Sequence, residues 1–128
     1  MMELFNIKNK EILKSATGFG GGIGNMGATC GAFAGGVLIL GILYGRSNLK
    51  HFKEKEETYL YCSKWYKTFI SYFKSCNCYN ILGVDLRDNN VRKKYWGEKA
   101  NREKCGKLVV GETAQMLLEL IREIEEAY

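Results

Sequence analysis

The feature that most constrains this chain is a segment without charge, residues 15–45, whose composition changes midway. Its first part, FGGGIGNMG, has a glycine density that costs too much backbone entropy for the interior of a helix. The part that follows, ATCGAFAGGVLILGILYG, ends in aliphatic residues that favour burial. We therefore predict a glycine-rich loop and then a helix over residues 28–45, with Cys30 in its first turn.

The rest of the chain is helical in pattern. Its 128 residues are enough for one domain, residues 1–128, and proline, the strongest helix breaker, is absent from the sequence. Further helices are predicted at residues 8–17, 48–75 and 102–126, with residues 77–99 the least regular part. The expected fold is an all-α, single-domain bundle of about four to five helices, with the glycine-rich loop before the second helix.

Two of the predicted helices carry apolar residues at helical spacing, and these faces are expected to be buried. In the helix over residues 48–75 the face consists of Phe52, Tyr59, Cys62, Tyr66, Phe69, Phe73 and Cys76. In the last helix it consists of Cys105, Leu108, Val109, Met116, Leu120 and Ile124.

Several classes of partner are not expected. Residues 27–45 approach the length of about 20 residues that crosses a bilayer, but only residues 37–43 are strongly aliphatic, so no membrane span is predicted. The net charge of +5 is modest and acids are mixed with the bases, so nucleic acid is not an expected partner. The first fifteen residues lack the pattern of a signal peptide, which predicts a cytoplasmic protein.

A formal GxGxxG pattern, formed by Gly22, Gly24 and Gly27, stands directly before the predicted helix. A dinucleotide site also needs a preceding buried strand and an acidic residue about 20 positions further on. Here the preceding residues are helical in pattern, and Arg46 and Ser47 stand where an acid is needed. We do not predict a dinucleotide site, although backbone amides at this helix start could hold an anion.

The cysteines are the residues most suited to chemistry. There are five, Cys30, Cys62, Cys76, Cys78 and Cys105. In a reducing compartment, clustered cysteines are more often metal ligands or redox-active thiols than structural disulfides. A helix start favours the thiolate form of Cys30, while Gly31 and Gly35 leave room beside its sulfur. Cys62 is expected to be a small buried hydrophobe, and the single histidine, His51, to be solvated.

The block FGGGIGNMGATCGAFAGGVLILGILYGR, with Cys30 to Gly35 at its centre, resembles the CGAxxG segment of a family of redox-active proteins, the C_GCAxxG_C_C family. The stretches CYNILGVDL, from Cys78, and CGKLVVGETA, from Cys105, resemble its later cysteine blocks. Order and spacing agree over about residues 10–124. The family pattern opens with an upstream cysteine that residues 1–17 lack, and Cys76 or Cys62 could replace it.

The resemblance implies an electron carrier or oxidoreductase with an unidentified redox partner, in which Cys30, Cys78 and Cys105 are the catalytic candidates. In one mechanism, an iron-sulfur cluster or other metal is held by Cys30, Cys76, Cys78 and Cys105. Gly22, Gly24, Gly31 and Gly35 are then the candidate residues beside the cofactor. The number of cysteines favours this mechanism, but the sequence has no CxxC pair that would specify a metal site.

Two alternatives stay open. In the first, Cys30 attacks a disulfide and Cys78 or Cys105 resolves the intermediate, without any metal. In the second, the chain is a noncatalytic helical interaction module. Gly27, Gly31 and Gly35 repeat at a spacing of four residues, which allows helices to approach closely, so a homodimer is expected.

Overall fold

A computed structural model describes residues 2–3 and 5–128 of the chain. Its elements are α1 (Lys10–Ser15), the 3-10 turn η1 (Thr17–Phe19), α2 (Gly20–Ile23), α3 (Gly31–Tyr44), α4 (Phe52–Phe73), α5 (Cys78–Leu82), α6 (Asn89–Gly97), α7 (Lys99–Glu103), the π-helical segment η2 (Lys104–Val110) and α8 (Gly111–Glu126). Within the described residues there is no strand beyond a single isolated bridge, so the all-α prediction is confirmed.

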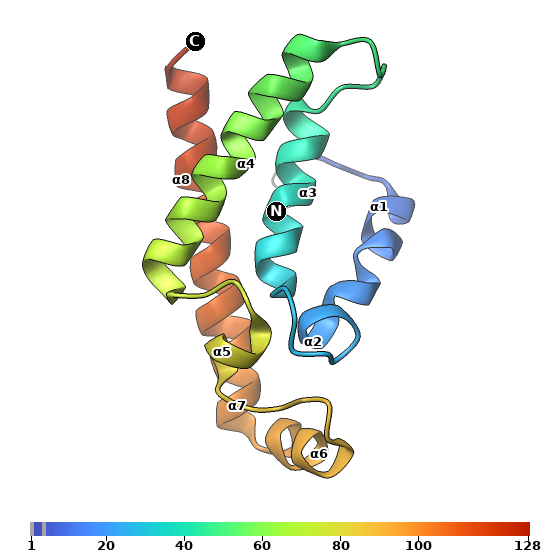
Figure 1. Cartoon of the computed structure of the whole chain (residues 1–128), viewed down its shortest axis with the longest axis vertical. Helices are drawn as coiled ribbons and strands as arrows, with labels where there is room; N and C mark the ends of the chain where they lie inside the picture. Colours follow the sequence, from blue (N-terminus) through green and yellow to red (C-terminus); the bar gives the residue numbers. More distant parts are fainter. Residues whose placement is uncertain (1, 4) are drawn as a thin grey trace.

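Three long helices form the body of the molecule, because α3, α4 and α8 all pack against one another. In Figure 1, α4 crosses α3 obliquely, and α1 and α2 lie on the other side of α3. The segment from α7 through η2 to α8 runs as one continuous helical rod, and α6 lies at the end of the molecule beyond α5. None of the helices in the described part of the chain is both long and apolar enough to cross a membrane.

The crossing of α3 and α4 is built on a glycine and a tryptophan. Trp65 is fully buried, and its indole Nε1 donates a hydrogen bond of 3.1 Å to the carbonyl of Phe33. A Cβ atom at Gly36 would lie only 2.5 Å from that nitrogen, so the indole lies directly on the glycine backbone. The Phe33 ring stacks on Trp65 and meets Phe69 edge to face, with centroids 5.2 Å apart in the second pair. Gly36 thus sets how closely the two helices approach.

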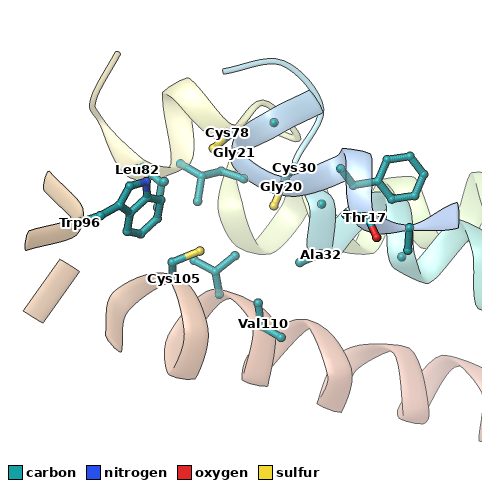
Figure 2. A pocket seen from close by; sticks show the side chains of 17 residues that line it. Thr17, Gly20, Gly21, Cys30, Ala32, Cys78, Leu82, Trp96, Cys105 and Val110 are labelled. Carbon is teal, nitrogen blue, oxygen red and sulfur yellow. The ribbon is translucent and has the colours of Figure 1, made fainter. Parts of the chain in front are cut away.

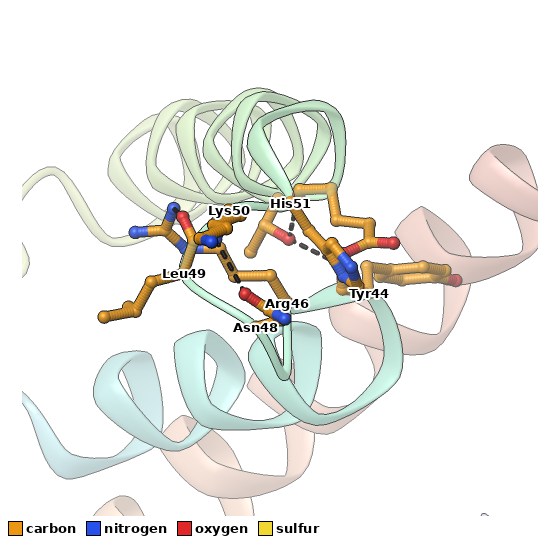
Figure 3. A network of polar contacts seen from close by, with 8 residues as sticks. Tyr44, Arg46, Asn48, Leu49, Lys50 and His51 are labelled. Atoms are coloured by element: carbon orange, nitrogen blue, oxygen red, sulfur yellow. Dashed lines mark hydrogen bonds and ion pairs between the residues drawn. The ribbon is translucent and has the colours of Figure 1, made fainter.

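The connection between α3 and α4 is closed by side chains that bond to the backbone (Figure 3). Thr58, in the second turn of α4, donates its hydroxyl to the carbonyl of Tyr44 at 2.8 Å. Within the connection, Arg46 donates to the carbonyl of Leu49 at 2.6 Å. These contacts hold the end of α3 beside the start of α4, which keeps the crossing at Gly36 in register.

Three of the seven residues predicted for the buried face of α4 are exposed instead. Phe52, Tyr59 and Tyr66 are 66%, 62% and 49% exposed, whereas the buried residues of the helix are Tyr61, Trp65 and Phe69. The sequence of α4 offers two overlapping aromatic stripes, and periodicity alone does not rank them. In the buried stripe, the Trp65 indole lies against Gly36 and donates its N–H to the carbonyl of Phe33.

The predicted helix boundaries in the second half of the chain also differ from those in the structure. Residues 77–99, expected to be the least regular part, contain α5 and α6; Asp88 caps α6 by accepting from the amides of Asn90 and Val91. The last helix begins at Lys99 and is interrupted by η2, which changes its phase. Leu108, predicted to be buried, is therefore 50% exposed, while Val109 is buried.

The glycine pair in α3 gives a direct test of the crossing. Gly36→Ala is expected to lower the free energy of unfolding by about 2 kcal/mol, because the new methyl group displaces the Trp65 indole. Gly35→Ala is the matched control, because a Cβ there has no atom within 4 Å. It is expected to stabilise α3 by up to about 1 kcal/mol through helix propensity. Urea denaturation measures both, and equal effects would contradict this account.

Candidate functional site

Three of the five cysteines face one cavity of about 370 Å³. Cys30 is the residue that immediately precedes α3, Cys78 is the first residue of α5, and Cys105 lies in η2. Figure 2 shows their three side chains entering the same space from three different elements. Cys30 and Cys78 are buried, and Cys105 is half-buried. Most of the remaining lining is apolar, including Ile81, Leu82, Trp96, Val109 and Val110.

A short piece of antiparallel pairing holds Cys30 and Cys78 together. The amide of Cys30 donates to the carbonyl of Cys76, and the amide of Cys78 donates to the carbonyl of Ala28, both at 2.7 Å. These two bonds flank the isolated bridge between Thr29 and Asn77. They join two loops that are far apart in the sequence, so the relative position of the two thiols is fixed by backbone rather than by side-chain packing.

The glycine-rich stretch is a left-handed turn and not an open loop. Residues 21–25 all have positive φ, and amides 24–28 bond back to carbonyls 18–23 around the turn. Such a run of left-handed residues is costly unless most of them are glycine. Position 22 needs glycine for a second reason as well. A Cβ there would lie 2.5 Å from the Cβ of Cys78 and 2.7 Å from the carbonyl oxygen of Ala28.

The direction of the Cys105 side chain depends on the change in helical phase. It lies in the π-helical segment Lys104–Val110, between α7 and α8, together with Val109 and Val110 of the cavity wall. The last helix was predicted to begin at residue 102, but in the structure the helical rod already begins at Lys99. π-Helical insertions often occur at functional sites, where they redirect side chains. Here the insertion accompanies the turn of Cys105 toward Cys30.

The three thiols influence one another electrostatically. Burial raises the pKa of Cys78 to about 11, and the neighbouring Cys30 and Cys105 add to this effect. Burial also raises the pKa of Cys105, again with a contribution from Cys30. The pKa of the Tyr95 phenol is raised by burial and by Cys105 and Cys78. Cys78 and Cys105 are therefore neutral thiols at pH 7, within electrostatic range of each other and of Cys30.

The structure places the other site candidates differently. Cys76 and Cys62 pack against the main core and are not among the residues that line the cavity. Burial raises the pKa of Cys62. His51 is half exposed, with Nδ1 2.8 Å from a carboxylate oxygen of Glu54. Among residues 2–3 and 5–128, no three His, Cys, Asp or Glu side chains are arranged to hold a metal ion.

The candidate cofactor glycines divide into two groups. Gly22, Gly31 and Gly35 line the cavity, whereas Gly24 ends α2 and faces open space. Sequence reasoning missed Trp96, which forms part of the cavity wall. It stands in a stretch rich in Lys and Arg, and the edge-to-face packing of Tyr95 on Trp96, at 4.9 Å between centroids, cannot be inferred from residue spacing.

Comparison with known proteins gives one match. A family model described as "Putative redox-active protein (C_GCAxxG_C_C)" matches residues 1–120, a range that includes all three cysteines of the cavity. No curated protein and no solved structure matches the chain.

Two glycines with similar backbone angles separate the effect of contact with Cys78 from the effect of conformation. Gly24→Ala, at φ +56° in open space, is expected to lower the free energy of unfolding by about 1 kcal/mol. Gly22→Ala, at φ +70°, is expected to lower it by about 3 kcal/mol, because the methyl group also collides with Cys78. Alkylation of Cys78 in the folded protein, followed by mass spectrometry, should accelerate only in Gly22→Ala. Equal rates of Cys78 alkylation in the two variants would contradict the proposed contact.

The raised pKa of Cys78 also predicts a loss of stability in alkali. Between the ordinary pKa of about 9 and the folded value of about 11, the unfolded chain loses a proton that the folded protein keeps. The free energy of unfolding therefore falls as pH rises, by about 2 kcal/mol for this thiol across that window. Urea midpoints between pH 8 and pH 11 should fall less steeply for Cys78→Ala than for the native protein, because the variant lacks this thiol. Some fall remains in the variant, because the tyrosines titrate in both proteins. Parallel curves would contradict the assignment.

Proposed function

The chain belongs to the C_GCAxxG_C_C family of redox-active proteins, and on that basis we propose that its redox chemistry is carried out by Cys30, Cys78 and Cys105. The observation that carries the proposal is the convergence of these three thiols, from three separate elements, on one largely apolar cavity. A structural role for the thiols would need only their burial. The open volume between them leaves space for a reacting group.

The arrangement supports thiol-disulfide chemistry best. Burial raises the pKa of Cys78 and of Cys105, which makes these two thiols poorer nucleophiles at neutral pH, so we assign the first attack to Cys30, the residue that precedes α3. The Cys30 thiolate attacks one sulfur of an acceptor disulfide, forms a mixed disulfide and releases one acceptor thiolate.

The second step closes the cycle within the protein. Cys78 or Cys105 loses its proton and attacks the Cys30 sulfur, which forms an intramolecular disulfide and releases the second acceptor thiolate. The protein gives up two electrons and two protons, and the acceptor disulfide becomes two thiols. Both Cys78 and Cys105 line the cavity together with Cys30, so either is a candidate for the resolving thiol.

A second candidate is an iron-sulfur or other metal centre held by the same thiols. Two observations favour it: three thiols are more than a disulfide needs, and a bound cation would stabilise thiolates that burial disfavours. The thiols are suitable donors, but their spacing does not fit a single ion and Cys76 does not line the cavity. A bound cluster would supply one-electron transfer. The donor count therefore ranks this candidate second.

One pair of measurements distinguishes the two candidates. Protein purified without oxygen is assayed for iron, sulfide and zinc, and its thiols are counted before and after incubation with oxidised glutathione. Thiol-disulfide chemistry predicts five free thiols in the reduced protein and two fewer after oxidation, with the new bond mapped to Cys30. A metal centre predicts stoichiometric metal. If no metal is found and all five thiols resist oxidation, both proposals fail.

A matched pair of serine variants tests the role of Cys30. Cys30→Ser is expected to abolish the loss of two thiols on oxidation, because it removes the attacking group. Cys62→Ser is the control, since Cys62 is a partly buried cysteine that does not line the cavity, and it should oxidise like the native protein at some cost in stability. Equal loss of oxidation in folded samples of both variants would contradict the assignment.

A further inference from the structure

A second hollow lies beside the thiol cavity, between α1, α3 and α8. It is a groove of about 480 Å³, within the range of small-molecule sites. Its lining is dominated by aliphatic side chains and small residues, namely Ile12, Leu13, Leu38, Ile39, Ile42, Leu117, Ala114 and the glycines of α3. Glu3 is the one charged side chain among the described residues that line it. The groove is therefore suited to an apolar molecule.

The groove and the thiol cavity are neighbours with a common wall. Both are lined by Ala16, Gly31, Ala32, Gly35 and Val110. Every residue of this wall is glycine, alanine or valine, and the space beside Gly35 is open for at least 4 Å. A molecule held in the groove is thus separated from the cysteines by little more than backbone and short side chains.

One buried polar group in the groove lacks a partner. Thr113 of α8 lines the groove and is 4% exposed, and within the described part of the chain its hydroxyl has no hydrogen-bond partner. A helical threonine commonly donates to the carbonyl four residues earlier; here that residue, Val109, belongs to the π-helical segment, and the bond is not made. Buried hydroxyls are normally satisfied, and rotation about χ1 exchanges the hydroxyl with the methyl group. The hydroxyl oxygen itself is buried, and this rotation would turn it into the groove, where it can donate to a ligand with an acceptor oxygen.

We propose that this groove binds a small apolar quinone, which accepts electrons from the thiol site; the inference rests on the proposed thiol-disulfide function. A quinone has an apolar ring, carbonyl oxygens that can accept from Thr113, and no charge that would conflict with an aliphatic lining. It also takes up two electrons and two protons, the number that a dithiol releases.

The step balances without any other reactant. Cys30 and either Cys78 or Cys105 lose their thiol hydrogens and form one sulfur-sulfur bond. The two electrons and two protons pass to the quinone, whose two carbonyls become hydroxyls. The products are the protein disulfide and the hydroquinone. In this proposal the quinone ring comes close to the sulfur atoms beside Gly35, which lines both hollows and where an added Cβ would have no atom within 4 Å.

The test uses duroquinone, whose fully substituted ring does not add to thiols. Binding to the oxidised protein is measured by equilibrium dialysis, and hydroquinone formation from the reduced protein is followed anaerobically. The native protein should bind duroquinone and form one hydroquinone for each two thiols lost. Thr113→Val, which keeps the shape of the side chain, should weaken binding about tenfold by removing one hydrogen bond. Ala114→Leu, which fills the groove, should abolish binding.

Gln115→Leu provides the control, because Gln115 lies on the exposed side of the same helix. It should bind duroquinone like the native protein, and all three variants should still be oxidised by glutathione disulfide. If glutathione disulfide oxidises the native protein but duroquinone neither binds nor reacts, the groove assignment is wrong while the proposed function stands. If neither reagent oxidises it, the proposed function fails. A native dimer that Ala114→Leu converts to monomer would make a second copy the occupant and overturn the quinone assignment.

Discussion

Two backbone hydrogen bonds carry the geometry on which the site depends. The bonds from Cys30 to Cys76 and from Cys78 to Ala28, each 2.7 Å, tie the loop before α3 to the loop after α4. Because they are backbone bonds inside a partly buried bridge, they orient both segments at once. The Cys30 thiol, the start of α3 and the start of α5 are thereby assembled together, and η2 supplies the third thiol from the opposite wall of the cavity.

The charge-free segment can now be explained by two kinds of close approach. In the left-handed turn, Gly22 allows the backbone to touch Cys78; in α3, Gly36 allows Trp65 to lie on the helix. Neither contact leaves space for a side chain, and neither leaves room for the water that a charged group would need. The aliphatic end of the segment then buries Ile39 and Leu40 against α4 and α8. The same residues that resemble a short membrane span are the centre of a helical core.

The sequence was sufficient for the fold class and for the three cysteines that line one cavity, and insufficient where the answer depended on tertiary contacts. Each long helix was predicted, yet periodicity could not choose between two aromatic stripes on α4, because that choice depends on the contact with Gly36 of another helix. The phase change in η2 leaves no mark in residue spacing, so Leu108 was assigned to the core. Cys76 was a reasonable fourth ligand by its position beside Cys78, but only the bridge register shows that its backbone, opposite Cys30, supports the site from outside the cavity.

Three thiols in one cavity can form two alternative disulfides, which a pair of thiols cannot. Under the proposed chemistry, Cys30 can pair with Cys78 on one wall or with Cys105 on the other, and the third thiol is then free to attack the disulfide that has formed. Such an exchange changes neither the number of electrons nor the number of protons in the protein. Its rate depends on ionisation of the third thiol, which burial opposes at neutral pH in both cases. Under the proposed chemistry, burial of Cys78 and Cys105 therefore slows the exchange between the two disulfides, and it gives an external thiol time to attack the first disulfide and reduce it.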